Sequence, residues 1–276
     1  MIVGICAYNR PDHLAAVLHG LHEQAARLNA LYIYCDGPKA GDETLCEQVR
    51  EIANSVDWTD CIVTEYDRNR GLKRSVIGTM DHMLIDMAYK DAVLLEDDCA
   101  PGPHFLHYMK ACLDKYRNHD TVLGISGYTV PIPADVRKEY PWSNYFVKRV
   151  GSWGWATWSD RWELLERDLD KAVQQIGVPA VATVGRDMVG YTARATTGLD
   201  VWTPNWQMTA LRQDAFYSYP VVSHVANIGF DGSGTCKVNS SRYESPIAKR
   251  WPVKRLAPGV VCHPETSDAF RRYYPL

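Results

Sequence analysis

The sequence predicts an α/β protein built on a mostly parallel, doubly wound sheet flanked by helices. Short apolar runs alternate with segments of helical spacing from residue 1 to about residue 126. Polar and charged residues directly follow most of these runs. Because the carboxyl ends of parallel strands meet at one edge of a sheet, these residues should gather where open α/β sheets bind ligands.

The elements can be placed in chain order. Strands are expected at residues 2–8, 31–35, 61–66, 92–95 and 121–126, and helices at 11–21, 42–56, 72–89 and 103–117. Pro11 suits the first turn of the first helix because its φ angle is already helical. Beyond about residue 130 the periodicity weakens. There we expect a short strand at 146–147, helices at 161–169 and near 200–208, an extended segment at 221–227 and a glycine loop at 229–234.

The composition is that of a globular protein with a substantial core, at 46% hydrophobic and 23% charged residues among 276. A net charge of -3 gives no general attraction to nucleic acid. The eight cysteines are scattered, which favours buried thiols in a reducing, cytoplasmic compartment. The first residues lack a basic, apolar leader, and no run reaches the length of a membrane span, so neither a signal peptide nor a spanning helix is expected.

The stretch 92–98 combines an apolar strand with three adjacent carboxylates, Glu96, Asp97 and Asp98. Adjacent like charges repel, and a divalent cation is the usual compensation. Oxygen ligands favour Mn²⁺ or Mg²⁺, and the absence of a Cys/His cluster argues against zinc. A solvated acidic turn is the alternative interpretation of this stretch.

Arg10, Asp36 and the basic segment 68–74 follow other strands and should reach the same edge. No glycine-rich dinucleotide motif follows the first strand, and no P-loop is present. The convergence of acids and arginines therefore indicates a nucleotide site of a different type.

Taken in order, the segments 6–10, 35–36, 71–73, 96–98, 154–155, 200–206 and 219–233 resemble the GT-A fold glycosyltransferases. The pattern is most similar to the alpha-mannoside N-acetylglucosaminyltransferase I type, alongside bacterial family 2-like enzymes. Two departures stand out. The nearest acid to Trp202 is Asp200, where the family has two adjacent acids, and Cys236 stands where related bacterial sequences tend to have histidine.

The resemblance implies one GT-A domain in two halves. Residues 1–126 would bind the nucleotide sugar, and residues 127–276 would bind the acceptor and supply a closing loop and a C-terminal tail. The implied enzyme is an inverting, metal-dependent hexosyl- or N-acetylhexosaminyltransferase in polysaccharide biosynthesis. It would move a sugar from a nucleotide diphosphate, expected to be UDP, to a hydroxyl of a glycan or lipid-linked acceptor. The basic, aromatic tail allows at most peripheral contact with the inner face of a membrane.

The donor-binding roles follow the same resemblance. Asp98 would bind the metal, Asp97 the ribose hydroxyls or metal-bound waters, and Glu96 the sugar or a nearby helix. Other residues would contact the nucleotide sugar. Arg10 would bind a uracil carbonyl or a phosphate, and Asp36 would accept from the uracil N–H. Lys73 or Arg74 would contact the diphosphate, and Trp155 would stack on a sugar.

The acceptor hydroxyl must lose its proton as it attacks, and a carboxylate performs this step well. Asp200 is the expected base, and Asp231 in the glycine loop is the second candidate. An N-cap of the following helix is the alternative role for Asp200. A single displacement with one base inverts the anomeric centre.

Two other functions fit parts of the sequence. A nucleotidyltransferase acting on sugar phosphates would share the sheet and the metal, but it should carry a glycine- and lysine-rich loop where residues 8–11 stand. A non-catalytic carbohydrate-binding module would explain the nine tryptophans but not the charged residues at one edge.

Overall fold

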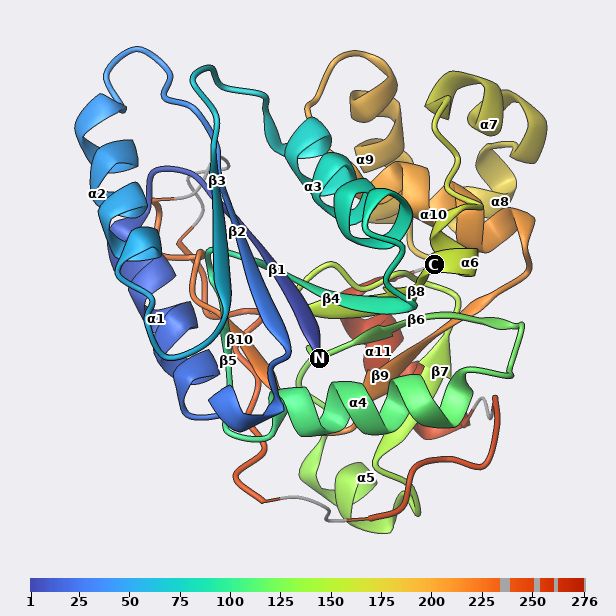
Figure 1. Ribbon diagram of the computed structural model, residues 1–276. Helices are drawn as coiled ribbons and strands as arrows, with labels where there is room; N and C mark the ends of the chain where they lie inside the picture. The colour runs from blue at the N-terminus through green and yellow to red at the C-terminus, as the bar shows by residue number, and fades with distance from the viewer. Residues whose placement is uncertain (234–238, 251–253, 261–262, 276) are drawn as a thin grey trace.

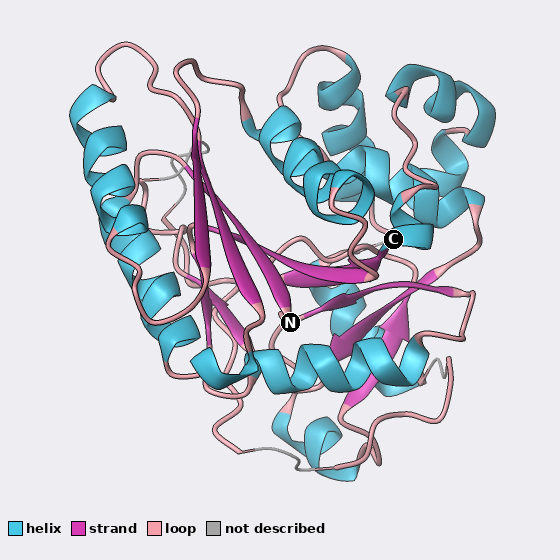
Figure 2. Cartoon of the chain, viewed as in Figure 1, coloured by secondary structure: helices cyan, strands magenta, loops and turns pink. Residues whose placement is uncertain are grey.

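The computed structural model describes residues 1–233, 239–250, 254–260 and 263–275 of the chain. A twisted central sheet runs through the molecule, with helices packed on both of its faces (Figures 1 and 2). This arrangement confirms the predicted α/β class with a mostly parallel, helix-flanked sheet.

The eight strands of the main sheet lie in the order β3-β2-β1-β4-β8-β6-β9-β7. Their bounds are β1 Ile2–Ala7, β2 Ala30–Cys35, β3 Cys61–Glu65, β4 Asp91–Glu96, β6 Val122–Ser126, β7 Asn144–Val147, β8 Trp155–Trp158 and β9 Phe216–Pro220. Six strands share one direction, while β8 and β7 run antiparallel to their neighbours. A separate two-stranded ribbon pairs β5 (Cys99–Pro101) with β10 (Val225–Asn227).

Each face of the sheet buries its own apolar core. Helices α1 (Pro11–His22), α2 (Glu43–Asn54) and α4 (Phe105–Tyr116) cover one face. The other face is covered by α3 (Leu72–Asp81), α6 (Ser159–Trp162), α10 (Thr203–Arg212) and α11 (Pro264–Tyr273). Strand β4 is buried on both sides, which explains why its sequence is continuously apolar.

Helix bounds in the second half depart from the predictions. The expected helix 161–169 is wrong, because α6 ends at Trp162 and the next helix, α7 (Leu169–Ile176), begins after Asp168. The carboxylate of Asp168 accepts a hydrogen bond from the amide of Lys171, 3.0 Å away, and so caps α7 as a separate helix. Two further helices, α8 (Val178–Ala182) and α9 (Arg186–Thr196), complete a small cluster with α10.

Other elements differ less. The helix expected at 72–89 is divided into α3 and the π-helical turn η2 (His82–Asp86). The 3₁₀ turn η1 (Ala25–Arg27) and helix α5 (Ala134–Glu139) were not expected, nor were strands β8 and β9. The expected helix near residues 200–208 is confirmed as α10, with Pro204 in its first turn.

Candidate active site

The predicted convergence of polar residues at one sheet edge is confirmed. Cys6 of β1 pairs with Glu96 of β4, and Ala7 pairs with Cys35 of β2. Because these strands are parallel and in register, the residues that follow them emerge side by side. Arg10, Asp36 and the acidic triplet Glu96–Asp98 therefore lie at the same end of the sheet.

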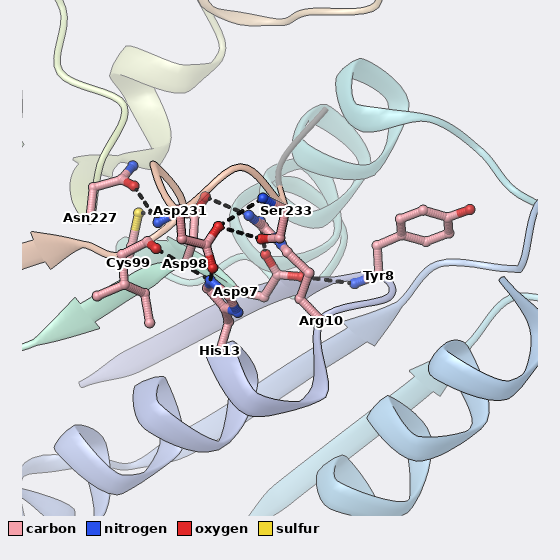
Figure 3. Close-up of polar contacts among 11 residues, drawn as sticks. Tyr8, Arg10, His13, Asp97, Asp98, Cys99, Asn227, Asp231 and Ser233 are labelled. Atoms are coloured by element: carbon pink, nitrogen blue, oxygen red, sulfur yellow. Dashed lines mark hydrogen bonds and ion pairs between the residues drawn. The ribbon is translucent and has the colours of Figure 1, made fainter. Parts of the chain in front are cut away.

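Arg10 binds directly to two members of the triplet (Figure 3). Its guanidinium donates to Asp97 and, over 2.9 Å, to Asp98 Oδ2. Asp97 also accepts a hydrogen bond from the backbone amide of Tyr8 at 3.1 Å. Arg10 precedes the first turn of α1, so the β1–α1 turn supplies the cation that partly neutralises the acids.

The triplet still carries more negative charge than Arg10 offsets. Burial, and then the charges of Asp98 and Asp97, raise the pKa of Glu96 to about 8, against the opposing effect of Arg10. Burial also raises the pKa of Asp97. The indole of Trp202 hydrogen-bonds to Glu96 and opposes the rise in its pKa. The carboxylates therefore lie in a setting that favours either protonation or a bound cation.

A hard divalent cation fits these residues. Its preferred ligands are carboxylate oxygens, and Mg²⁺ or Mn²⁺ sites commonly use one or two carboxylates together with substrate phosphates. Within the described ranges, no three His, Cys, Asp or Glu side chains are arranged to hold a metal by themselves. The protein alone would thus supply only part of a coordination sphere, with Asp98 as the predicted ligand.

Asp36 organises a loop rather than projecting freely into the site. Its Oδ1 accepts from the amides of Gly37 at 2.9 Å and Arg70 at 2.8 Å. Its Oδ2 accepts from the amide of Gly71 and the side chain of Asn69, at 3.1 and 3.2 Å. Three of these bonds fix the loop after β3 against the end of β2, and Asp36 is 6% exposed.

Asp200 caps helix α3 from a distant part of the chain. Its carboxylate accepts from the amides of Leu72 at 2.6 Å and Lys73 at 3.1 Å. Gly71 has a φ of +81°, and a Cβ there would lie 2.2 Å from Asp200 Oδ2, so glycine is needed for this approach. The capping alternative therefore applies to α3 and not to α10.

The side chain of Lys73 faces a cleft of ≈ 440 Å³ that also contains Asp200. No hydrogen bond or ion pair in the described residues joins Lys73 to the acidic triplet. The predicted contact of Lys73 with a diphosphate at the triplet therefore has no direct geometric support.

Trp155 lies inside the protein and not at the surface of the site. It is 0% exposed and stacks on Trp202, with ring centroids 4.9 Å apart and an interplanar angle of 20°. Trp162 and Trp206 complete this buried cluster. The predicted stacking of Trp155 on a donor sugar needs an exposed ring face, which the structure does not provide; Trp155 instead supports Trp202, the partner of Glu96.

The segment 228–233 lies against the triplet (Figure 3). The β5–β10 ribbon brings Asn227 opposite Cys99, and the amide of Ile228 donates to the carbonyl of Asp98 at 2.8 Å. A Cβ on Gly229 would lie 2.1 Å from Asp98 Oδ2. The segment expected to close over the donor is thus already in contact with the predicted metal ligand. Gly234 and Cys236 lie outside the described residues.

His13 is a site residue that sequence reasoning missed. Its Nε2 lies 3.3 Å from the carbonyl of Ile228 and 3.3 Å from Asp231 Oδ2. Asp231 is 48% exposed at its side chain, and the hydroxyl and amide of Ser233 lower its pKa. The only signal in the sequence was the position of His13 in the first turn of the helix that follows Arg10.

The C-terminal tail packs against the domain. Phe270 of α11 is buried against Tyr145 and Tyr219 of the sheet, while Arg271 pairs with Asp268 at 3.3 Å. None of the helices in the described part of the chain has the length and apolar character of a membrane span.

No protein family matches this chain, and no curated protein matches it in sequence. Solved structures do match its shape. One is a UDP-glucose pyrophosphorylase complexed with UDP-glucose, at 9% identity and a TM-score of 0.41, covering 80% of this chain and 90% of that one. The second is the mannosyltransferase PcManGT from Pyrobaculum calidifontis, in complex with GDP-Man and Mn²⁺, at 16% identity and a TM-score of 0.39, covering 80% and 56%.

A third match is TarS from S. aureus, at 10% identity and a TM-score of 0.43, covering 82% of this chain and 60% of that one. The resemblance to the N-acetylglucosaminyltransferase I type stays a prediction. The function of this chain is therefore argued below from its own site residues.

Proposed function

We propose that this chain is a metal-dependent, inverting glycosyltransferase of the GT-A type. It would transfer a sugar from a nucleotide diphosphate, expected to be UDP, to a hydroxyl of a glycan or lipid-linked acceptor. The observation that carries the proposal is the acidic triplet at the end of β4, held by Arg10 and partly uncompensated in charge. A sheet edge with this chemistry suits a metal and a diphosphate together.

Each residue at this edge has a role in the proposal. Asp98 would hold Mn²⁺ or Mg²⁺, with Asp97 beside it on the ribose or on metal-bound waters. When bound, the ion would act as a Lewis acid and offset the charge that develops on the leaving diphosphate. Arg10 keeps Asp97 and Asp98 in place and offers its own positive charge next to the phosphates. Asp36 fixes the loop that would border the base of the nucleotide.

Asp200 is the proposed base, with Asp231 as the alternative. Asp200 is exposed at the amino end of α3, where the cleft gives an acceptor hydroxyl access to its carboxylate. Removal of the hydroxyl proton by this carboxylate as the bond forms would give a single displacement, and hence inversion.

A non-catalytic carbohydrate-binding module is a weaker explanation of the same sequence. Such a module needs exposed aromatic rings for sugars to stack on. Five tryptophans are almost completely buried instead, namely Trp155, Trp158, Trp162, Trp202 and Trp206. Their number therefore reflects the core rather than a binding platform.

Calorimetry of UDP binding with and without Mn²⁺ tests the proposal. Binding should require the metal and should be lost in Asp98→Asn, whereas Asp114→Asn on the exposed face of α4 should bind UDP as the unmodified chain does. Absence of metal-dependent binding to the unmodified chain would refute the proposal. NMR of the product then reports the anomeric configuration, and retention would exclude the single displacement.

A further inference from the structure

A cleft lined mainly by cations lies along α3, and the acidic triplet is not among its lining residues. We call it the α3 cleft; its charged lining residues are Arg70, Lys73, Arg74, Asp81 and Asp200. Residues 73, 74, 77, 78 and 81 recur at helical spacing and so line one side of α3, while Arg70 lies in the loop just before it. With a volume of ≈ 440 Å³ it falls in the size range of small-molecule sites.

The acids of the cleft are already engaged. Asp200 accepts hydrogen bonds from the backbone amides of α3. Asp81 accepts two hydrogen bonds from Arg167, at 2.9 and 2.8 Å, and one from the indole of Trp162 at 2.8 Å. Neither carboxylate forms an ion pair with a cation that lines the cleft.

The cations of the cleft are not neutralised by acids. Across residues 1–233, 239–250, 254–260 and 263–275, no Asp or Glu forms an ion pair with Arg70, Lys73 or Arg74. Three positive charges therefore line a cavity in which Asp81 is already paired with Arg167 and Asp200 is the remaining acid, so the net charge of the cleft favours binding of an anion.

Arg70 is held in place rather than extended into solvent. Its guanidinium lies over the ring of Tyr66, 4.1 Å from the centroid. The group also lies beside Gly78, where an added Cβ would be only 2.7 Å from Arg70 Nη2. Glycine at position 78 thus leaves space for the guanidinium of Arg70. The planar N–H donors of Arg70 are therefore pre-positioned for a phosphate.

We propose that the α3 cleft binds a phosphate group carried by the acceptor substrate. The proposal rests on the transferase function given above, because Asp200 both lines this cleft and is the proposed base. A phosphate held by Arg70, Lys73 and Arg74 would place the rest of the acceptor beside the Asp200 carboxylate. Lys73 then serves the acceptor and not the donor diphosphate.

Inorganic pyrophosphate in the presence of EDTA is the probe, since chelation removes any metal-dependent binding at the triplet. Calorimetry should show binding to the full chain that weakens about 10-fold in Arg70→Gln and in Arg74→Gln, as expected for loss of one charge-assisted contact. Lys115→Gln, an exposed change on α4 across the sheet, should leave the affinity unchanged. Equal affinities in all four proteins, or no binding, would overturn the proposal.

Gly78→Ala separates binding from folding. The added methyl should displace Arg70 and weaken pyrophosphate binding, while alanine inside a helix should raise the melting temperature. A more stable protein that binds less tightly cannot be explained by partial unfolding. Unchanged affinity in Gly78→Ala would refute the role of the Arg70 position.

UDP binding and competition distinguish the acceptor from the donor. UDP with Mn²⁺ should bind to Arg70→Gln as tightly as to the unmodified chain, and weaker UDP binding in Arg70→Gln would overturn the proposal by assigning the cleft to the donor. A soluble hexose phosphate and phosphatidylcholine vesicles carrying a polyprenyl phosphate should be tested as competitors. Displacement by either supports the proposal and identifies the carrier, and displacement by neither overturns it.

If UDP fails to bind but pyrophosphate still binds through Arg70 and Arg74, the transferase function is wrong while the anion site stands. If UDP binds with Mn²⁺ and pyrophosphate does not bind, only the acceptor site is wrong. The two failures are therefore distinguishable.

Discussion

Asp200 offers the sharpest test because the structure gives it two separable roles. As a cap it accepts hydrogen bonds from the amides of Leu72 and Lys73 at 2.6 and 3.1 Å. Replacing a capping side chain with alanine costs about 1 kcal/mol. For a chain of this size the expected fall in melting temperature for Asp200→Ala is about 2–4 °C.

Asparagine retains one acceptor oxygen, whereas the carboxylate of Asp200 uses both of its oxygens to cap α3. Asp200→Asn should therefore keep one capping bond and melt between Asp200→Ala and the unmodified protein, yet its amide cannot accept a proton from the acceptor. Loss of a general base reduces turnover by about 10²- to 10⁴-fold. UDP affinity with Mn²⁺ should remain unchanged, because the nucleotide is proposed to bind at the triplet.

The measurements are thermal unfolding, calorimetry with UDP and Mn²⁺, and initial rates at saturating donor. Asp168 provides a matched control, because it caps α7 through the amide of Lys171 at 3.0 Å and lies on the exposed surface away from the triplet. Asp168→Ala should lower stability as Asp200→Ala does while leaving transfer intact. Normal turnover in Asp200→Asn would refute its role as base and move that role to Asp231. Normal stability in Asp200→Ala would refute the cap.

Three further outcomes are expected. Asp36→Asn should lower the free energy of unfolding by about 2–4 kcal/mol, because it weakens the charge-assisted bonds between a buried carboxylate and the loop after β3. An unchanged urea midpoint would contradict this. Because the pKa of Glu96 is raised to about 8, the metal-free folded protein retains a proton that the unfolded chain releases. The free energy of unfolding in EDTA should therefore fall between about pH 4.5 and pH 8, by at most about 5 kcal/mol. Glu96→Gln should flatten this pH dependence. Gly229→Ala places a methyl 2.1 Å from Asp98 Oδ2 and should weaken Mn²⁺-dependent UDP binding, whereas Gly190→Ala, with open space around it, should not.

The first half of the fold was predictable because its signals are local. Each parallel strand is a short apolar run, and each helix has its own periodicity, so chain order alone defines the alternation. Strand β8 was missed for the opposite reason. It is four residues long, is buried throughout and contains two tryptophans, so neither length nor alternation marks it as a strand.

The site was predictable in its location but not in its internal contacts. The residues after β1, β2 and β4 had to meet once the strands were parallel. The contact of Asp200 with α3 joins residues more than a hundred positions apart, and no local pattern encodes it. The burial of Trp155 is also a property of the packed core. The dipeptide Gly154-Trp155 does not encode whether the tryptophan ring contacts a ligand or packs on another tryptophan, as it does here on Trp202.

The position of β8 limits how this protein can move. It comes from the second half of the chain, yet it lies between β4 and β6 of the first half and hydrogen-bonds to both. A hinge between the two halves would have to break these bonds, so a rigid-body opening of one half against the other is excluded as a route for substrates. A fragment ending at residue 126 would leave β4 and β6 without a common neighbour and with open edges prone to aggregation. Any opening at the sheet edge must therefore come from short segments there, and the two halves are not independent modules.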